Sequence, residues 1–263
     1  MKNKIFPLVL FFPAVAGICG AFLRGSQIKE AHDTANGFIS GGTLSSNGLF
    51  ILSILVFAIA IGAALLFTKW FKLSGKDVSQ TKIAVPFYIS AALILAYAGL
   101  VLLPVVNGDF SAINLILGLF SVYCAASLFV LGRHNMAERE STAYCVMSAV
   151  PVFWACFMLV LTFREKISDP IIWDYVFHIF AYLSVLFSAY SITAHALGKN
   201  KKAIAVFTCF CGIFFFLIEL VSPFISGGNI ELTIAKITEL IPSLAFLILL
   251  PFATMEILKK NNE

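Results

Sequence analysis

The sequence predicts an all-α polytopic integral membrane protein, with about eight transmembrane helices and both termini in the cytoplasm. Two observations support this fold class. Of the 263 residues, 60% are hydrophobic and only 12% are charged, whereas soluble domains carry about 25% charged residues. The hydrophobic residues also come in runs of about 20, the length a helix needs to cross the hydrocarbon core. Since backbone groups in lipid must be paired within each segment, these runs are expected to be helices.

The runs divide the chain into eight expected spans joined by short polar connections. The longest connection, 25–47, is rich in Gly and Ser. The whole chain, 1–263, is therefore expected to form a single helical bundle without a separate soluble domain. The expected spans are 5–23, 47–68, 84–106, 111–132, 143–163, 170–197, 203–225 and 237–257.

Basic residues predict the orientation. Thirteen of the 18 lysines and arginines fall in segments that lie inside if the N-terminus is cytoplasmic, and five fall outside. This bias follows the positive-inside rule. The five on the outer side are Arg24, Lys29, Arg164, Lys166 and Lys236.

The first 16 residues leave a second interpretation open. Two lysines precede an apolar stretch and an Ala-Val-Ala sequence at 14–16, a pattern also found in cleaved signal peptides. Because the apolar run continues to Leu23, we favour a membrane span. The other spans keep their orientation either way. The short loops are typical of a multi-pass protein of a prokaryotic cell membrane.

A weaker pattern indicates a parallel 4+4 repeat, with halves 1–140 and 141–263. The span that opens with 82–85 (Lys-Ile-Ala-Val) ends at Pro104, and the span that opens with 202–206 (Lys-Ala-Ile-Ala-Val) ends at Pro223. Parallel repeats occur in transporters, with the binding site between them. Apolar helices use a small alphabet, so chance likeness is the alternative.

Several ionisable residues fall in the outer part of the expected membrane region. Asp174, His178 and Tyr182 recur every four residues in the sixth span, so they share one helix face. Glu219 lies in the seventh span, six residues from its outer end. The helical rise places these groups roughly 6 to 12 Å below the outer surface.

Arg164, at the end of the fifth span, and Glu239, near the start of the eighth, flank the same level. Ionisable groups inside a membrane are costly and usually face the bundle interior or water. We therefore predict an outward-facing polar pocket that binds a cation, a proton or a small polar solute. The alternative is structural: the end residues lie among headgroups, and His178 and Glu219 form interhelical hydrogen bonds that fix the packing.

Three functions remain open from the sequence. The best supported is a small-solute or ion transporter, or a permease-like subunit. The second is a non-catalytic membrane subunit of a larger complex, with an ATPase or a sensor as partner. The third is an intramembrane lipid-modifying enzyme with His178 as base and Asp174 orienting it. No nucleophile lies at suitable spacing, so we do not expect an enzyme.

The expected partners are the lipid bilayer and either a partner protein or a second copy of the chain. Basic residues are dispersed at the ends of apolar runs, so nucleic acid is not expected. No cofactor is expected either, because the sequence contains no phosphate loop and no dinucleotide fingerprint. Asp174 and His178 could supply two metal ligands, and Glu219 a third if the two helices are neighbours. The sequence lacks the two-His helical pair typical of a zinc hydrolase, so no metal site is predicted.

Two features of the apolar runs lead to packing expectations. Small residues at four-residue spacing, Ala58 with Gly62 and Ala92 with Ala96, are expected to let helices approach closely. Trp154 and the run 214–216 (Phe-Phe-Phe) are expected to face lipid or the interfacial belt.

Overall fold

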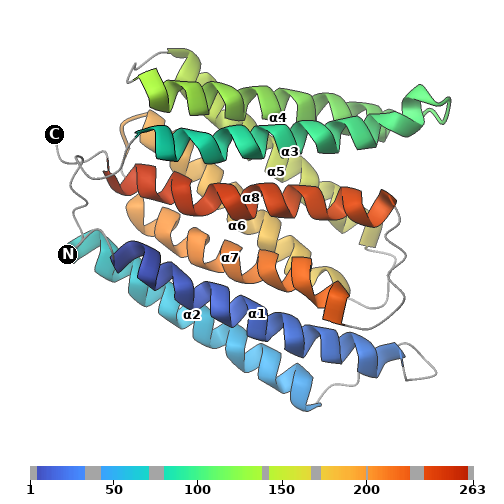
Figure 1. Ribbon diagram of the computed structural model, residues 1–263, viewed down its shortest axis with the longest axis vertical. Coiled ribbons are helices and arrows are strands. Elements are labelled where there is room, and N and C mark those ends of the chain that lie inside the picture. The colour runs from blue at the N-terminus through green and yellow to red at the C-terminus, as the bar shows by residue number, and fades with distance from the viewer. Residues whose placement is uncertain are drawn as a thin grey trace.

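A computed structural model describes residues 5–32, 43–70, 80–137, 142–166, 173–199, 201–225 and 234–259 of the protein. Within these ranges there are eight α-helices and no strand. The helices form one bundle in which successive helices run in opposite directions (Figure 1). The helices are α1 (Ile5–His32), α2 (Leu44–Trp70), α3 (Gln80–Val106), α4 (Ala112–Ala137), α5 (Thr142–Lys166), α6 (Trp173–Ala196), α7 (Lys202–Ile225) and α8 (Ile234–Lys259).

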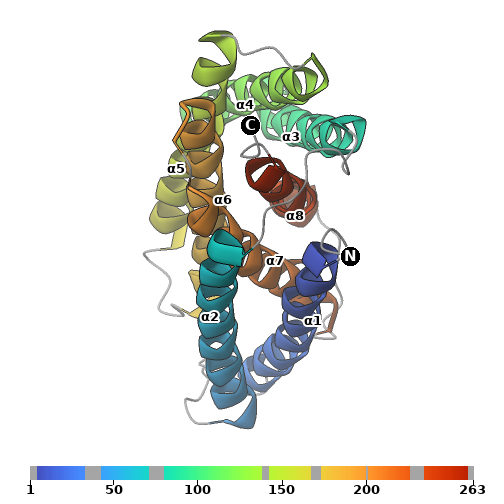
Figure 2. The same ribbon diagram turned by 90° about the vertical axis from the view of Figure 1, so that its left-hand side faces the viewer.

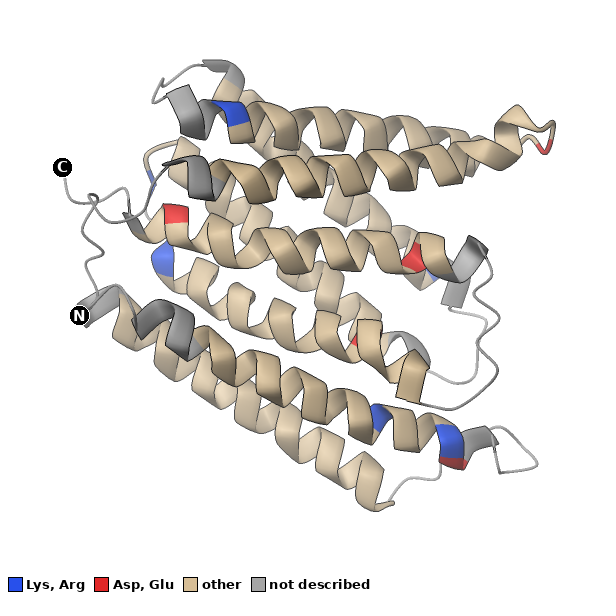
Figure 3. Cartoon of the chain, viewed as in Figure 1, with Lys and Arg blue, Asp and Glu red and all other residues tan. Residues whose placement is uncertain are grey.

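All eight helices are long and apolar enough to cross a membrane. Charged side chains of the described residues gather towards the two ends of the bundle and leave a largely uncharged band between them (Figure 3). Large hydrophobic side chains such as Phe50, Leu65 and Phe153 are exposed on the sides of this band, where lipid would cover them. The predicted fold class, a polytopic helical membrane protein, is confirmed.

The first residues of α1 and the last residues of α8 lie at the same end of the bundle (Figure 1). An even number of crossings requires this arrangement. We call this end the inner end, following the orientation that the basic residues predict, and the opposite end the outer end.

α1 extends well past the predicted span. The sequence predicts an end near Leu23 and a loop from Gly25, whereas the helix continues to His32. Arg24 donates a hydrogen bond to the side chain of Gln27, one turn further along, at 2.7 Å, and both side chains are buried. The polar residues that suggested a loop are thus satisfied on a helix that packs against the bundle.

α7 is the central helix of the bundle. It packs against α1, α2, α6 and α8 and is the most buried of the spanning helices. The α1–α2 hairpin lies on one side of it, and the α3–α4 hairpin lies on the far side of α8 (Figures 1 and 2). The molecule is therefore elongated across its helices.

Glycines bring α1 against α7 along what we call the glycine seam, made of Gly17, Gly20 and Gly25. A Cβ atom at Gly17 would lie 2.8 Å from Cβ of Leu217, and one at Gly25 would lie 2.7 Å from Cβ of Ile225. Such distances leave no room for a side chain. Small residues of α1 therefore let this helix pack closely against α7.

The small residues that the sequence analysis selected are not at such contacts. A Cβ atom at Gly62 would meet nothing within 4 Å. Ala58, Ala92 and Ala96 are exposed on the surface of the chain. The prediction was wrong for these residues because spacing alone does not show which side of a uniformly apolar helix faces a neighbour.

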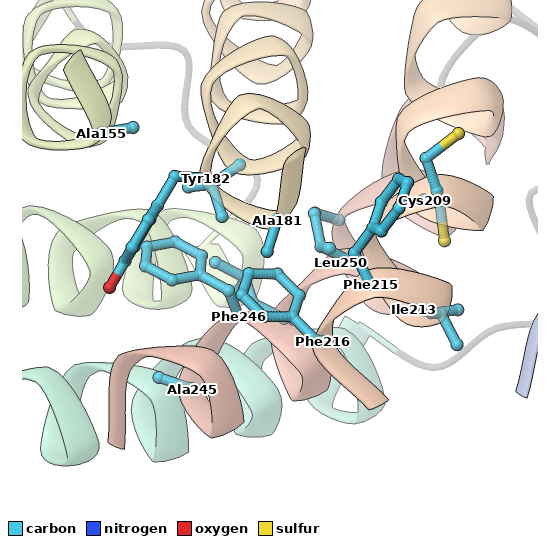
Figure 4. Packing of buried hydrophobic residues seen from close by; sticks show 14 of the residues in the cluster. Ala155, Ala181, Tyr182, Cys209, Ile213, Phe215, Phe216, Ala245, Phe246 and Leu250 are labelled. Carbon is cyan, nitrogen blue, oxygen red and sulfur yellow. The ribbon is translucent and has the colours of Figure 1, made fainter. Parts of the chain in front are cut away.

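An aromatic core lies in the middle of the bundle. Trp154 is fully buried, and its ring packs 5.3 Å from Phe246 and 6.0 Å from Tyr182, centroid to centroid. Its indole N–H donates to the hydroxyl of Ser121 at 2.9 Å. Figure 4 shows Tyr182 and Phe246 in this core.

The prediction that Trp154 and 214–216 face lipid is wrong, because all four side chains are at most 2% exposed. The indole N–H finds a buried acceptor, and the three phenylalanines fill the space around the central helix α7. Figure 4 shows Phe215 and Phe216 among the packed side chains.

The internal repeat stays a prediction. Under it, α5 corresponds to α1 and α3 corresponds to α7. α1 packs along α7, whereas α5 and α3 meet through side chains such as Trp154 and Tyr97 and share no comparable interface in the described ranges. The helix contacts of the two halves are therefore not interchangeable.

The glycine seam can be tested with a matched pair of substitutions. Gly17→Ala should destabilise the protein by about 1–3 kcal/mol, the usual cost of overpacking. Gly62→Ala should be neutral or slightly stabilising, because the added methyl group meets open space. Thermal unfolding of the purified variants in detergent measures the difference. Equal stability of the two variants would show that the seam is not tightly packed.

Candidate functional site

Two ionisable side chains meet inside the outer part of the bundle. His178 lies in the second turn of α6, and Glu219 lies in α7, six residues before that helix ends. The imidazole Nδ1 is in direct contact with the carboxylate Oε1, and each side chain is only 13% exposed. The structure thus joins two residues that the sequence analysis placed at a similar depth on separate helices.

A third helix supplies another partner for the same carboxylate. Ser243 of α8 is completely buried and donates its hydroxyl to Oε2 of Glu219 at 3.1 Å. Tyr182, one turn deeper on α6, packs edge-on against the ring of His178, with centroids 4.9 Å apart. We call His178, Tyr182, Glu219 and Ser243 the outer cluster. Both oxygens of its carboxylate contact a polar group from a neighbouring helix.

Close packing two turns deeper holds these three helices in place. At Gly212 of α7, an added Cβ atom would clash with the side chain of Leu250 on α8 and lie 3.3 Å from Cβ of Ser184 on α6. α8 is also tied to α3, because Ser90 donates to the carbonyl of Ala245 at 2.8 Å. The absent side chain of Gly212 lets α7 lie close enough to both neighbours for Glu219 to reach them.

The outer cluster lies directly over the aromatic core. Tyr182 belongs to both, because its ring contacts His178 on one side and Trp154 on the other. Phe246 follows Ser243 by one turn on α8 and packs on Trp154. Aromatic side chains therefore close the inner side of the cluster, and its polar groups lie near the outer end.

The electrostatics of the pair depend on one proton. A carboxylate at the centre of a bilayer costs about 3 kcal/mol on insertion scales, and hydrogen bonds to ionised groups are about twice as strong as neutral ones. With a neutral imidazole, the pair of His178 and Glu219 carries one negative charge. With an imidazolium, its net charge is zero. The pair can therefore change its charge without exchanging its polar partners.

A buried arginine that the sequence analysis assigned to an outer loop packs against the residue that precedes His178 on α6. Arg24 of α1 is 3% exposed, and its guanidinium carbon is 5.5 Å from the ring centre of Phe177, the residue before His178. The glycine seam brings it there, since the next residue, Gly25, packs on the outer end of α7. The sequence did contain a signal for this position, because Arg24 directly follows an apolar run. The predicted span ended at Leu23, so Arg24 was assigned to the outer loop.

The other predicted site residues take different positions. Asp174 is the second residue of α6, and its side chain is outside the described residues. Arg164 and Glu239 are exposed at the outer ends of their helices, and neither contacts the outer cluster in the part of the chain that the structure describes. Helix ends project into the headgroup region, so exposure of such charges costs little.

A second polar contact lies at the inner end of the bundle. The hydroxyl of Tyr144 on α5 hydrogen bonds with the carboxylate of Glu256 on α8, and we call these two residues the inner pair. Nearby, the thiol of Cys145 donates to the carbonyl of Ala196 at 3.3 Å. Glu256 follows Ser243 by 13 residues on one helix, about 20 Å at the helical rise. The outer cluster and the inner pair thus lie near opposite ends of α8.

Among the described residues, no group of three or more His, Cys, Asp or Glu side chains is arranged to hold a metal ion. No protein-family model, no curated protein and no solved structure matches this chain. The function therefore has to be derived from the chemistry of the site.

The contact between Ser243 and Glu219 should contribute measurably to stability. We expect Ser243→Ala to cost about 1 kcal/mol, within the range of interhelical hydrogen bonds in membrane proteins. Ser53→Ala is the matched control, because Ser53 bonds only within its own helix, to the carbonyl of Leu49 at 2.8 Å. Equilibrium unfolding in mixed detergent micelles compares the two. A Ser243→Ala variant as stable as the control would argue against the hydrogen bond.

Proposed function

We propose that this chain is a membrane transport protein, or the permease-like subunit of one, that binds a small polar solute or an ion at the outer cluster. The supporting observation is that side chains from α6 and α8 converge on one nearly buried carboxylate of α7, Glu219. A carboxylate beside an imidazole and an aromatic ring suits a cationic or hydrogen-bonding ligand.

Prolines next to the cluster support the same proposal. Pro223 lies four residues after Glu219 on α7, and Pro242 directly precedes Ser243 on α8. A proline has no backbone N–H, so the carbonyls of Glu219 and Thr238 lose their ordinary helical donors. α7 and α8 are continuous through these prolines, but prolines in the helices beside a polar site are a recurring feature of transporters. Both helices can bend close to the point where they hold the carboxylate.

The geometry does not favour the lipid-modifying enzyme. In a nucleophilic triad, the serine hydroxyl bonds to the histidine that acts as its base. Here the order is different, because Ser243 donates to Glu219 and the histidine contacts the other oxygen of the same carboxylate. Ser243 is thus not activated by His178. The non-catalytic subunit stays the competing proposal.

The proposal predicts that neutralising Glu219 abolishes transport while the protein still folds. Glu219→Gln keeps an acceptor for Ser243 and removes the charge beside His178. Losing a charge-assisted bond of about 1.5–3 kcal/mol should weaken ligand binding about tenfold or more. Currents would be recorded from proteoliposomes on a solid-supported membrane after concentration jumps of ammonium, choline, potassium or lysine.

Glu30→Gln is a close control. Glu30 also accepts a hydrogen bond from a serine hydroxyl, that of Ser45 at 2.8 Å, but it is exposed at the outer end of α1. Its variant should conduct like the wild type. Equal currents from Glu219→Gln would mean that the outer cluster is structural. A wild type that responds to none of the four solutes would favour the non-catalytic subunit.

A further inference from the structure

The carboxylate of the outer cluster has little room for a new ligand. One oxygen of Glu219 contacts the imidazole of His178, and the other accepts the hydroxyl of Ser243. Tyr182 is 1% exposed and covers the inner side of the imidazole. A solute at the carboxylate would have to share or displace these partners, whereas a proton needs no additional space.

A proton also changes the property that matters most in this environment, the net charge. With a neutral imidazole, the nearly buried pair holds an uncompensated negative charge, which is costly in a medium of low dielectric constant. Adding one proton to the imidazole gives an imidazolium beside a carboxylate, with no net charge. The Nδ1–H donor to Glu219 is kept, and the contact becomes charge-assisted on both sides.

Other ionisable groups surround the pair less closely. Arg24 of α1 is held against Phe177 and hydrogen bonds with Gln27, and the titratable hydroxyl of Tyr182 is on the same helix as His178. In the described part of α2, the outer half contains no ionisable side chain. Among residues whose side chains the structure describes, the remaining ionisable groups on the outer ends of neighbouring helices are Lys29 and Glu30 of α1, Arg164 of α5 and Glu239 of α8, all exposed.

We propose that the outer cluster takes up and releases a proton, carried by the pair of His178 and Glu219, and that this proton is the coupling ion of transport. The coupling role rests on the proposed function, whereas proton binding does not. The proton enters from water at the outer end, adds to the imidazole and leaves to water when the pair opens. Protonation strengthens the contact between α6 and α7, and deprotonation weakens it.

A consequence concerns the transported species. Once the imidazole has lost its proton, the negative charge of Glu219 needs another positive partner. A small cation that enters from the outer end can supply it, in place of the proton. Proton and cation are therefore expected to exclude each other at this site. Such exclusion is required of a protein that exchanges a proton for a cation across a membrane.

A pH jump tests the inference without any solute. Proteoliposomes on a solid-supported membrane receive a step in external pH at constant salt, and the wild type should give a transient charge displacement. Glu219→Gln and His178→Gln should give only the background of protein-free liposomes. Glu30→Gln, at an exposed carboxylate, should respond like the wild type.

A second measurement does not depend on variants that fold. Infrared difference spectra of the wild type, with isotopically labelled histidine, report imidazole protonation over the same pH step. The expected result is a histidine signal that accompanies the charge displacement. No charge displacement in the wild type, or equal displacement in Glu219→Gln, would overturn the inference.

The two proposals can fail separately. A pH-jump signal that requires both residues, with no current from ammonium, choline, potassium or lysine, would support the proton site and remove the solute-transport proposal. Solute currents that depend on Glu219 but not on pH, with no proton signal, would overturn the inference and leave the proposed function standing.

Discussion

In a bilayer, helices gain little from burying apolar side chains against each other, because lipid is equally apolar. Close packing and polar contacts must therefore hold the bundle together, and the two occur together around α7. The glycine seam lets α1 approach one side of it, and Gly212 lets α6 and α8 approach another. Only because α7 is packed this tightly can Glu219 contact side chains from two neighbouring helices at once.

Most interhelical polar contacts in the bundle use neutral groups. Ser121 accepts the indole N–H of Trp154, and Ser90 donates to a backbone carbonyl. The outer cluster differs because it places two ionisable side chains, His178 and Glu219, where neutral groups would hold the helices. Replacing a buried ion pair by apolar residues is often neutral or even stabilising. Packing alone therefore accounts poorly for this pair, and this is the main reason to assign it a function.

The spans could be predicted from the sequence because a bilayer demands about 20 apolar residues, whatever the fold. His178 and Glu219 could be selected as candidates because charge inside an apolar run is costly, and the structure brings their side chains into contact. Ser243 could not, because a serine in such a run can equally bond to its own backbone, as Ser53 does. Facing was unpredictable for the uniformly apolar helices: in α2, no periodic pattern separates the buried Val56 from the exposed Leu55. Arg24 was missed because its partner Gln27 lies one helical turn beyond the predicted end of the span.

The aromatic core constrains how anything could pass through this protein. The rings of Tyr182, Trp154 and Phe246 pack together on the inner side of Glu219, so a path inwards from this carboxylate would have to pass them. Opening such a path requires α6 and α8 to separate, because each contributes one ring to the layer around Trp154. The same two helices hold the carboxylate of α7 from either side. Under the proposed proton release, loss of the imidazole charge would weaken one of these contacts, and Pro242 lies beside the other on α8. The proposed binding site would thus also be the point from which the layer beneath it is opened.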